Sequence, residues 1–277
     1  MKKTALIILA FYTIAICYGQ TNTYKKNALE LANLKGNVKQ ITITRYTVIE
    51  KFGEIQKDSF NYKNITKYDR KGNELESKSY NFNGSLDNTY IMKYDEKNNK
   101  IEQNGIRPDG STIIKIIYDI KGNEKEYNNY NSDGSLNFKT ITKYDSDGNK
   151  TEQNNYHSDG SLYGKSIYSH KSNLSVENIY TFDGSLFLKY IVKFDKKGNT
   201  KESNCYITED SLLSKSIYNY DKRNNIIECN TSNILDNRKS SIVTYKYEYD
   251  YIGNWANEIE FKDGKAKYIS NQEVEYY

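Results

Sequence analysis

Hydrophobic and polar positions alternate along most of this chain, in short runs that are separated by turn residues. A typical run is Phe187–Phe194, which reads Phe-Leu-Lys-Tyr-Ile-Val-Lys-Phe and has the length and composition of a β-strand. The residues between such runs are mostly Asp-Gly or Gly-Asn pairs. These pairs supply the positive φ angles that tight turns require. The pattern therefore predicts a chain of β-strands that are joined by short turns.

The strands belong to a tandem repeat of about 25 residues, a period that is typical of repeat architectures. The repeated unit is Tyr-Asp-x-x-Gly-Asn-x-x-Glu-x-Asn-x-Tyr-x-x-Asp-Gly-Ser-Leu, followed by a strand-like run into the next unit. Its first position falls at Tyr68, Tyr94, Tyr118, Tyr144, Tyr168, Phe194, Tyr220 and Tyr249. With two turns in each unit, every unit is expected to form one β-hairpin, and eight units give about 16 strands.

Among the first seven units the spacing changes only in steps of two residues, and the eighth unit follows a longer insertion. Gly84 and Tyr94 are ten residues apart, whereas Gly110 and Tyr118 are eight apart. Removing two residues keeps every side chain on its own face of a strand, and removing one would reverse them all. A helical repeat would have no such preference, so this spacing also indicates strands.

A repeated glutamate decides between two topologies, a parallel solenoid and an antiparallel meander. It lies three residues after the Gly-Asn asparagine in six of the eight units, at Glu76, Glu102, Glu126, Glu152, Glu202 and Glu228. A parallel solenoid would stack these carboxylates about 4.8 Å apart, whereas a meander separates them by about 9.6 Å with another strand between. We therefore expect an all-β fold of tandem ~25-residue β-hairpin repeats that form a curled antiparallel meander. The same spacing predicts that Cys205 and Cys229 are too far apart to pair.

The chain begins with the pattern of a secretory signal peptide at residues 1–19. Lys2 and Lys3 precede an apolar stretch at residues 4–16, and small residues at Cys17 and Gly19 suit cleavage before Gln20. An uncleaved anchor is the alternative, but the apolar stretch is short for a membrane span. We expect export to the periplasm, the cell surface or the medium. The remaining boundaries that we predict are a lead-in (20–36), an irregular opening hairpin (37–67), the hairpin repeats (68–248) and a C-terminal capping unit (249–277).

Tandem Tyr-Asp-x-x-Gly-Asn units with Asp-Gly-Ser turns resemble the YD repeats of the Rhs family and of teneurins. The closest likeness is to short, stand-alone secreted YD-repeat proteins of bacteria, which share the Leu34-Lys35-Gly36-Asn37-Val38 start and the Gly253-Asn254-Trp255 end. The resemblance covers residues 34–277 and implies a curling antiparallel sheet of hairpins. It also implies carbohydrate binding as a candidate function.

Composition narrows the class of function. The 277 residues include 40 Lys+Arg against 36 Asp+Glu, so the chain is close to neutral and we expect no nucleic-acid partner. Aromatic residues make up 14% of the chain and there is one proline, which argues against disorder. The two histidines, His157 and His170, lie in no metal-binding or catalytic motif. We expect no enzymatic activity, no metal and no cofactor, and no transmembrane span in the mature chain.

One face of the repeat offers candidate ligand-binding residues. Positions three, five and seven after Gly-Asn share a face and bring together a carboxylate, an amide and an aromatic ring, a combination that suits a glycan. The candidates are Glu126, Asn128, Tyr130, Glu152, Asn154, Tyr156, Asn178, Tyr180, Glu202, Asn204 and Tyr206. The alternative is that these ladders stabilise the sheet through cross-strand contacts.

Three functional hypotheses follow. The first is an exported, non-enzymatic β-repeat protein that presents a binding surface to an envelope protein or a glycan. The second is a purely structural or assembly scaffold of the cell envelope. The third and weakest is an outer-membrane β-barrel, because Lys, Asn, Glu and Ser occupy both faces of the Glu-bearing strands, where a lipid-facing band should be apolar.

Overall fold

The computed structural model describes residues 27–207, 211–233 and 240–277. Within them, a short helix, α2 (Ala28–Leu31), precedes a single sheet of 18 strands. The strands are β1 (Val38–Lys51), β2 (Glu54–Tyr68), β3 (Glu74–Tyr80), β4 (Leu86–Tyr94), β5 (Lys100–Ile106), β6 (Thr112–Tyr118), β7 (Glu124–Tyr130), β8 (Leu136–Tyr144), β9 (Lys150–His157), β10 (Leu162–Lys171), β11 (Leu174–Thr181), β12 (Leu186–Phe194), β13 (Thr200–Tyr206), β14 (Leu212–Tyr220), β15 (Ile226–Asn233), β16 (Ser241–Tyr249), β17 (Trp255–Lys262) and β18 (Lys265–Tyr276).

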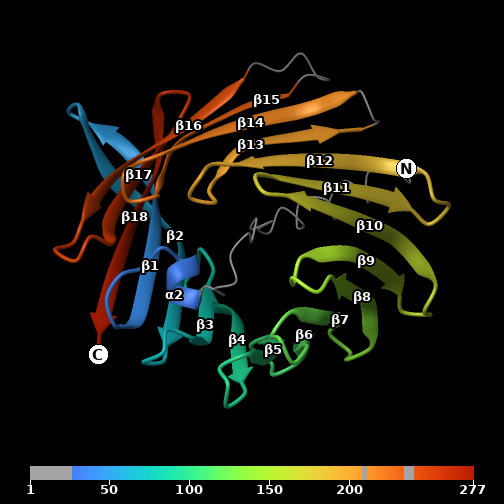
Figure 1. Cartoon of the computed structure of the whole chain (residues 1–277). Coiled ribbons are helices and arrows are strands. Elements are labelled where there is room, and N and C mark those ends of the chain that lie inside the picture. Colours follow the sequence, from blue (N-terminus) through green and yellow to red (C-terminus); the bar gives the residue numbers. More distant parts are fainter. Residues whose placement is uncertain (1–26, 208–210, 234–239) are drawn as a thin grey trace.

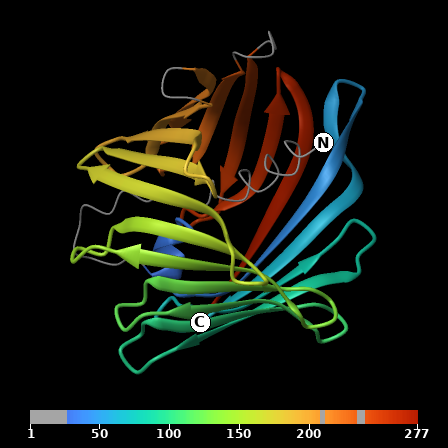
Figure 2. The same ribbon diagram turned by 90° about the vertical axis from the view of Figure 1, so that its right-hand side faces the viewer.

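The predicted antiparallel meander of hairpins is confirmed, and the structure adds that the sheet closes on itself. Each strand pairs with the next strand in the chain, and β1 also pairs with β18, from Val38 opposite Tyr276 to Thr47 opposite Tyr268. The result is an 18-stranded barrel (Figures 1 and 2). Closure leaves none of the 18 described strands at a sheet edge, and full closure is the usual way in which large antiparallel sheets avoid exposed edges.

The Gly-Asn turns explain why the repeat keeps Asp, Gly and Asn at fixed spacing. In the β2–β3 turn the Asp69 carboxylate accepts bonds from the Lys71 and Asn73 amides, at 2.8 and 2.9 Å. The Asn73 side chain donates to the other Asp69 oxygen at 2.8 Å. Gly72 has a φ of +82°, a conformation that side chains with a Cβ rarely adopt. The three residues therefore make one preformed turn.

Each regular Gly-Asn hairpin also contains a β-bulge. In the β2–β3 pair Lys67 lies opposite Glu76, but Tyr68 lies opposite Glu74, so that one extra residue, Leu75, is inserted on β3. A bulge changes the face to which the following side chains point. The residue directly after the Gly-Asn asparagine therefore lies opposite the Tyr of the Tyr-Asp pair, on the opposite face from the repeated glutamate.

The lead-in segment shows which face of the sheet lines the barrel. Helix α2 lies inside the ring of strands (Figures 1 and 2). Its Leu29 packs in a buried cluster with Val38, Ile41 and Tyr68. Directly opposed residues of an antiparallel pair share a face, so the registers extend this assignment around the sheet. The face that carries Tyr68 is called the lumenal face below, and the face that carries Lys67 is called the outward face.

The same segment joins turns from distant parts of the ring at the Gly-Asn end of the barrel. The Leu29 amide donates to the Gly72 carbonyl at 3.3 Å, in the β2–β3 turn. The Asn33 side chain donates to the Arg223 carbonyl at 2.8 Å, in the β14–β15 turn. Residues 27–36 therefore cross part of this mouth on the inside and hold the β1–β18 closure in place.

Asn254 connects the lead-in segment to the last strand. Its side chain donates to the Lys35 carbonyl at 2.9 Å and to the Tyr276 hydroxyl at 2.8 Å, and it accepts from the Lys35 amide at 2.8 Å. Asn254 is only 3% exposed. The Gly-Asn motif at this position therefore serves closure as well as turn formation.

The described segments contain no helix long and apolar enough to cross a membrane. Cys205 and Cys229 are unpaired. They lie on β13 and β15 opposite Tyr190 and Tyr218, which places both thiols on the lumenal face. The predicted signal peptide lies outside the described residues.

Candidate functional site

A row of tyrosines lines the lumen near the Gly-Asn end. Tyr94, Tyr144 and Tyr220 each donate their hydroxyl, at 2.8 Å, to the carbonyl of the residue that follows the preceding unit's Gly-Asn motif. The acceptors are the carbonyls of Glu74, Glu124 and Thr200. These bonds fix the rings against the wall, so the repeat builds a rigid aromatic surface inside the barrel.

Between the tyrosines runs a row of charges with alternating sign. The residue directly after each Gly-Asn asparagine is Glu74 on β3, Lys100 on β5, Glu124 on β7 and Lys150 on β9. These four residues, called the charge ladder below, lie opposite Tyr68, Tyr94, Tyr118 and Tyr144. Further round the ring the same position holds Leu174, Thr200, Ile226 and Trp255. At this repeat position, charged residues are thus confined to four successive units.

The two carboxylates of the ladder are half-buried. Burial raises the pKa of Glu74, an effect that the nearby Lys100 ammonium partly offsets. Burial also raises the pKa of Glu124, against the attraction of Lys150 and Lys100. Within the described part of the chain, neither carboxylate accepts a hydrogen bond or forms an ion pair within 4 Å. Unsatisfied, half-buried carboxylates are costly, and they are a common feature of ligand sites.

The two lysines of the ladder are held against the wall. Lys100 donates to the Gln103 side chain at 3.4 Å, and Lys150 donates to the Gln153 side chain at 3.2 Å. The Lys150 ammonium also lies 5.4 Å from the Tyr168 ring centroid. A cation close to an aromatic face is attracted by the ring quadrupole. This wall therefore accommodates ammonium groups beside its tyrosines.

The unit that starts at Tyr168 departs from the repeat. Ser169 and Ser172 replace the Asp and Gly of the turn, and a two-residue hairpin forms in which Lys171 pairs with Leu174. The bulge is lost, so Glu177 faces the lumen and is 6% exposed.

In this irregular unit, His170 takes over the role of the tyrosine hydroxyl. A His170 ring nitrogen lies 2.8 Å from the Lys150 carbonyl, where other units place a tyrosine. The Tyr168 hydroxyl instead donates to the Glu177 carboxylate at 2.7 Å. Burial raises the pKa of Glu177, and the Tyr168 bond partly opposes this rise. The unit therefore adds a third lumenal carboxyl group, hydrogen-bonded and enclosed in the wall.

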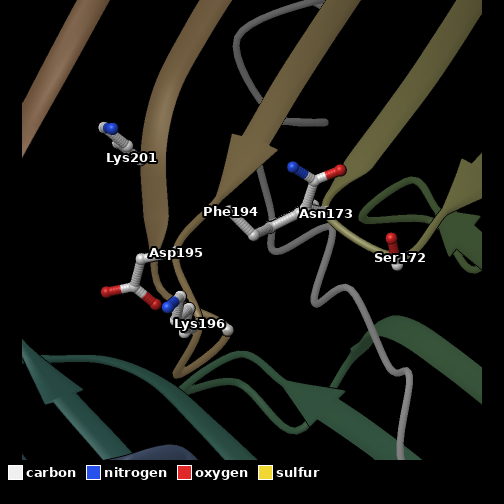
Figure 3. Close-up of a pocket in the computed structure, with 7 residues that line it drawn as sticks. Ser172, Asn173, Phe194, Asp195, Lys196 and Lys201 are labelled. Carbon is white, nitrogen blue, oxygen red and sulfur yellow. The ribbon is translucent and has the colours of Figure 1, made fainter.

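A small pocket of about 380 Å³ lies beside this irregular hairpin (Figure 3). Ser172 and Asn173 line it on one side, and the β12–β13 turn with Asp195 and Lys196 lines it on the other. The Asp195 carboxylate accepts amide bonds from its own turn at 2.8 and 2.9 Å, so it is occupied structurally. The pocket contains none of the residues that the sequence predicted as a site.

The charge pair at the closure of the barrel also faces the lumen. Arg45 on β1 forms an ion pair with Glu260 on β17. The Arg45 guanidinium lies 4.0 Å from the Tyr268 ring centroid. These contacts join β1, β17 and β18 on the inner side and reinforce the pairing that closes the sheet.

The predicted ligand residues lie on the outward face. In four of the described units the Asn side chain donates to the Glu two residues before it, for example Asn128 to Glu126 at 2.8 Å and Asn154 to Glu152 at 2.7 Å. Asn204 and Glu202 make the same bond at 2.8 Å. The structure therefore brings each Glu and Asn together. The four tyrosines lie at or next to the ends of the same strands and are half-buried: Tyr130, Tyr156, Tyr180 and Tyr206. Two residues before Asn178, Val176 takes the place of the glutamate.

Lysines on neighbouring strands complete these outward clusters. Glu152 pairs with Lys143 at 2.9 Å and with Lys165 at 3.1 Å. Hydrogen bonding from Lys143, then from Asn154 and Lys165, lowers the pKa of Glu152 to about 2. Glu202 forms the matching pairs, and its pKa is lowered to about 2 by Asn204 and Lys193. Each cluster satisfies its own charges, and whether these residues also bind a ligand stays a prediction.

Sequence reasoning missed the charge ladder, although its residues can be read directly from the repeat. Counting by twos places Glu74 on the same face as Glu76, whereas the bulge separates them. The usable signal was the position itself, because it alternates between Glu and Lys in four successive units.

Comparisons with known proteins show similarity of shape only. No family model matches the chain, and no curated protein matches it. Solved structures that resemble it include a porin-like protein from Bacteroides uniformis, with 12% identity, 86% of this chain and 96% of that chain covered, and a TM-score of 0.46. A second, a porin-like protein from Bacteroides vulgatus, has 12% identity and a TM-score of 0.40, and the match covers 87% of this chain and 98% of that chain. Because both TM-scores are below 0.5, the assignment of the fold rests on the strand pairing and not on these likenesses. Membership of the YD-repeat family stays a prediction.

The closed sheet corrects the first functional hypothesis. An exported repeat protein that presents an extended surface to an envelope protein or a glycan is wrong, because the meander closes through the β1–β18 pairing into an 18-stranded barrel. Closure gives the molecule an interior with its own chemistry. Of the three hypotheses, the structure favours the outer-membrane β-barrel, which the sequence had ranked lowest.

Proposed function

We propose that the protein is an exported β-barrel that acts through its lumen, by admitting small polar solutes. The observation that carries this proposal is the closed 18-stranded sheet, whose inner wall carries tyrosines, glutamines and the charge ladder. Barrels of 16–18 strands are wide enough to leave an aqueous interior, whereas eight-stranded barrels are filled by their own side chains. A polar wall suits a water-filled interior and does not suit a hydrophobic core.

An outer-membrane pore is the first form that this function can take. The strands are antiparallel, even in number and joined in sequence, as in bacterial outer-membrane barrels. The two ends of the barrel also differ. The lead-in segment crosses part of the Gly-Asn mouth and would narrow the lumen there.

A barrel that stands in water, as a chamber of the envelope, is the second form, and the outward face favours it. Lys93–Glu102, Lys143–Glu152 and Lys193–Glu202 ion pairs lie on that face at 2.8–2.9 Å. Arg or Lys facing lipid near the middle of a bilayer costs about 2–4 kcal/mol each. Fractionation decides between the two forms. A pore stays with outer membranes after washing with high salt and carbonate, whereas a chamber is released without detergent.

The lumenal thiols provide a direct test of the shared proposal. Cys229 is half-buried, whereas Cys205 is 6% exposed and burial raises its thiol pKa. In folded mature protein, a small charged thiol reagent should label Cys229 in the Cys205→Ser variant. The same reagent coupled to a large dextran should label Cys229 far more slowly, even after correction for the rate at which the conjugate reacts with free cysteine. The Cys229→Ser variant, in which only Cys205 remains, is the matched control for a buried thiol and should react slowly with both reagents.

The opposite result would overturn a solute-accessible lumen. If Cys229 stays unlabelled in the folded protein but reacts fully after unfolding in urea, small solutes do not reach the inner wall. Equal rates with the small reagent and the dextran conjugate would likewise contradict an enclosed interior.

A further inference from the structure

The charge ladder differs from the other charged positions of the repeat. Outward carboxylates such as Glu152 are neutralised by lysines at 2.9 and 3.1 Å. Inward carboxylates at Glu74 and Glu124 accept no hydrogen bond within the described residues and experience the nearby lysines only through longer-range attraction. The wall therefore holds two carboxylates that accept no hydrogen bond from the described residues, alternating with two lysines that glutamine side chains hold in place.

The spacing of these charges follows from the meander. Glu74, Lys100, Glu124 and Lys150 lie on every second strand, so neighbouring members of the ladder are about 9.6 Å apart. A tyrosine from the intervening strand lies between each pair. For example, Tyr118 lies opposite Glu124, and its ring centroid is 5.8 Å from the Lys100 ammonium. A ligand that joins two adjacent charges would therefore cross an aromatic ring.

The ladder carries two negative and two positive groups, so it gives no advantage to a ligand of one charge sign. A solute with an ammonium group at one end and a carboxylate at the other satisfies two neighbouring positions at once. An extended peptide spans at most about 3.3–3.6 Å per residue, so about three residues bridge the interval between a Glu and a Lys.

We infer that the charge ladder binds short zwitterionic peptides of about three residues, with the amino terminus on a glutamate and the carboxyl terminus on a lysine. This inference rests on the proposed lumenal function and names its class of solute. The peptide backbone would lie across Tyr118 or an equivalent ring. Neutralising the half-buried carboxylates would remove the dominant attraction for the amino terminus.

The experiment is calorimetric titration of folded mature protein with Ala-Ala-Ala at pH 7. The expected result is saturable binding that N-acetyl-Ala-Ala-Ala-amide, which lacks both charges, fails to reproduce. The double variant Glu74→Gln with Glu124→Gln should weaken binding at least tenfold. The matched control is Glu76→Gln on the same strand as Glu74, which removes an outward carboxylate and should leave the affinity unchanged.

Three outcomes would overturn the inference. They are no binding of Ala-Ala-Ala, equal binding of the blocked peptide, or unchanged affinity in a folded double variant. Circular dichroism and the unfolding midpoint establish whether each variant is folded. Labelling of Cys229 in the same samples separates the two proposals. If the peptide does not bind but Cys229 is labelled, only the class of ligand is rejected. If Cys229 stays unlabelled, the lumenal function itself is rejected.

Discussion

Replacing Asn254 with alanine tests whether the lead-in segment holds the barrel closed. The side chain makes three hydrogen bonds, two with the Lys35 backbone and one with the Tyr276 hydroxyl, at 2.8–2.9 Å. Each such bond contributes about 0.5–1.5 kcal/mol to stability, so their loss should lower the free energy of unfolding by about 3 kcal/mol. In a chain of this size that corresponds to a fall in melting temperature of about 6–12 °C.

Asn149 offers a matched control, because it occupies the same repeat position in the β8–β9 turn. Its side chain makes one bond, to the Asp145 carboxylate at 3.1 Å. Asn149→Ala should therefore cost about 1 kcal/mol. The difference of about 2 kcal/mol between the two variants measures the contacts that Asn254 adds between the lead-in segment and β18.

The assay is equilibrium unfolding in urea, followed by far-ultraviolet circular dichroism and by the fluorescence of Trp255. Agreement between the two probes shows that unfolding is a single transition, which the comparison requires. If both asparagine variants lose the same stability within error, the bonds to Lys35 and Tyr276 do not hold the barrel together. The lead-in segment would then not be needed to keep the barrel closed.

Three further predictions follow from individual contacts. Gly105→Ala should destabilise the barrel by about 1–3 kcal/mol in the same urea assay, because a Cβ at this position would lie 2.8 Å from both the Ile114 and Tyr90 side chains. Unchanged stability would contradict the close packing of these side chains against Gly105. The pKa of Glu152 is lowered to about 2, so ionised Glu152 stabilises the fold above its unfolded pKa, and this stabilisation is lost as the pH falls from about 5 to 2. Glu152→Gln should therefore flatten the dependence of the unfolding free energy on pH in that range. An unaltered pH dependence would exclude the effect. Burial raises the pKa of Glu124, so ionisation of this carboxyl group as the pH rises destabilises the fold. Glu124→Gln should therefore raise the melting temperature at pH 7 and have less effect near pH 4. A lower melting temperature of the variant at pH 7 would contradict this.

Much of the local structure is written in the repeat. The spacing in even steps requires strands, and the Asp-x-x-Gly-Asn segment contains the donors, acceptors and positive φ angle of its own turn. The separation of like charges is enough to select the antiparallel meander. These features depend on residues that are close in the sequence, and so the pattern could predict them.

The location of the candidate site could not be predicted in this way. Glu74 and Glu76 are two residues apart and would share a face in a regular strand, but the bulge opposite Tyr68 places them on opposite faces. Likewise, the loss of Asp and Gly at Ser169 and Ser172 is visible in the sequence. Its consequence, a lumenal Glu177, depends on the register of β10 and β11.

The sequence by itself determined the hairpin repeat, its turns and its antiparallel order. Only the tertiary structure decided that the sheet closes, and therefore which face became an interior. Closure depends on the twist and stagger summed over all 18 strands and on the match between β1 and β18, whose paired residues are more than 200 positions apart. No local pattern encodes such a sum. A small change in stagger at each hairpin would leave every repeat intact, but the first and last strands would no longer meet and the sheet would stay open.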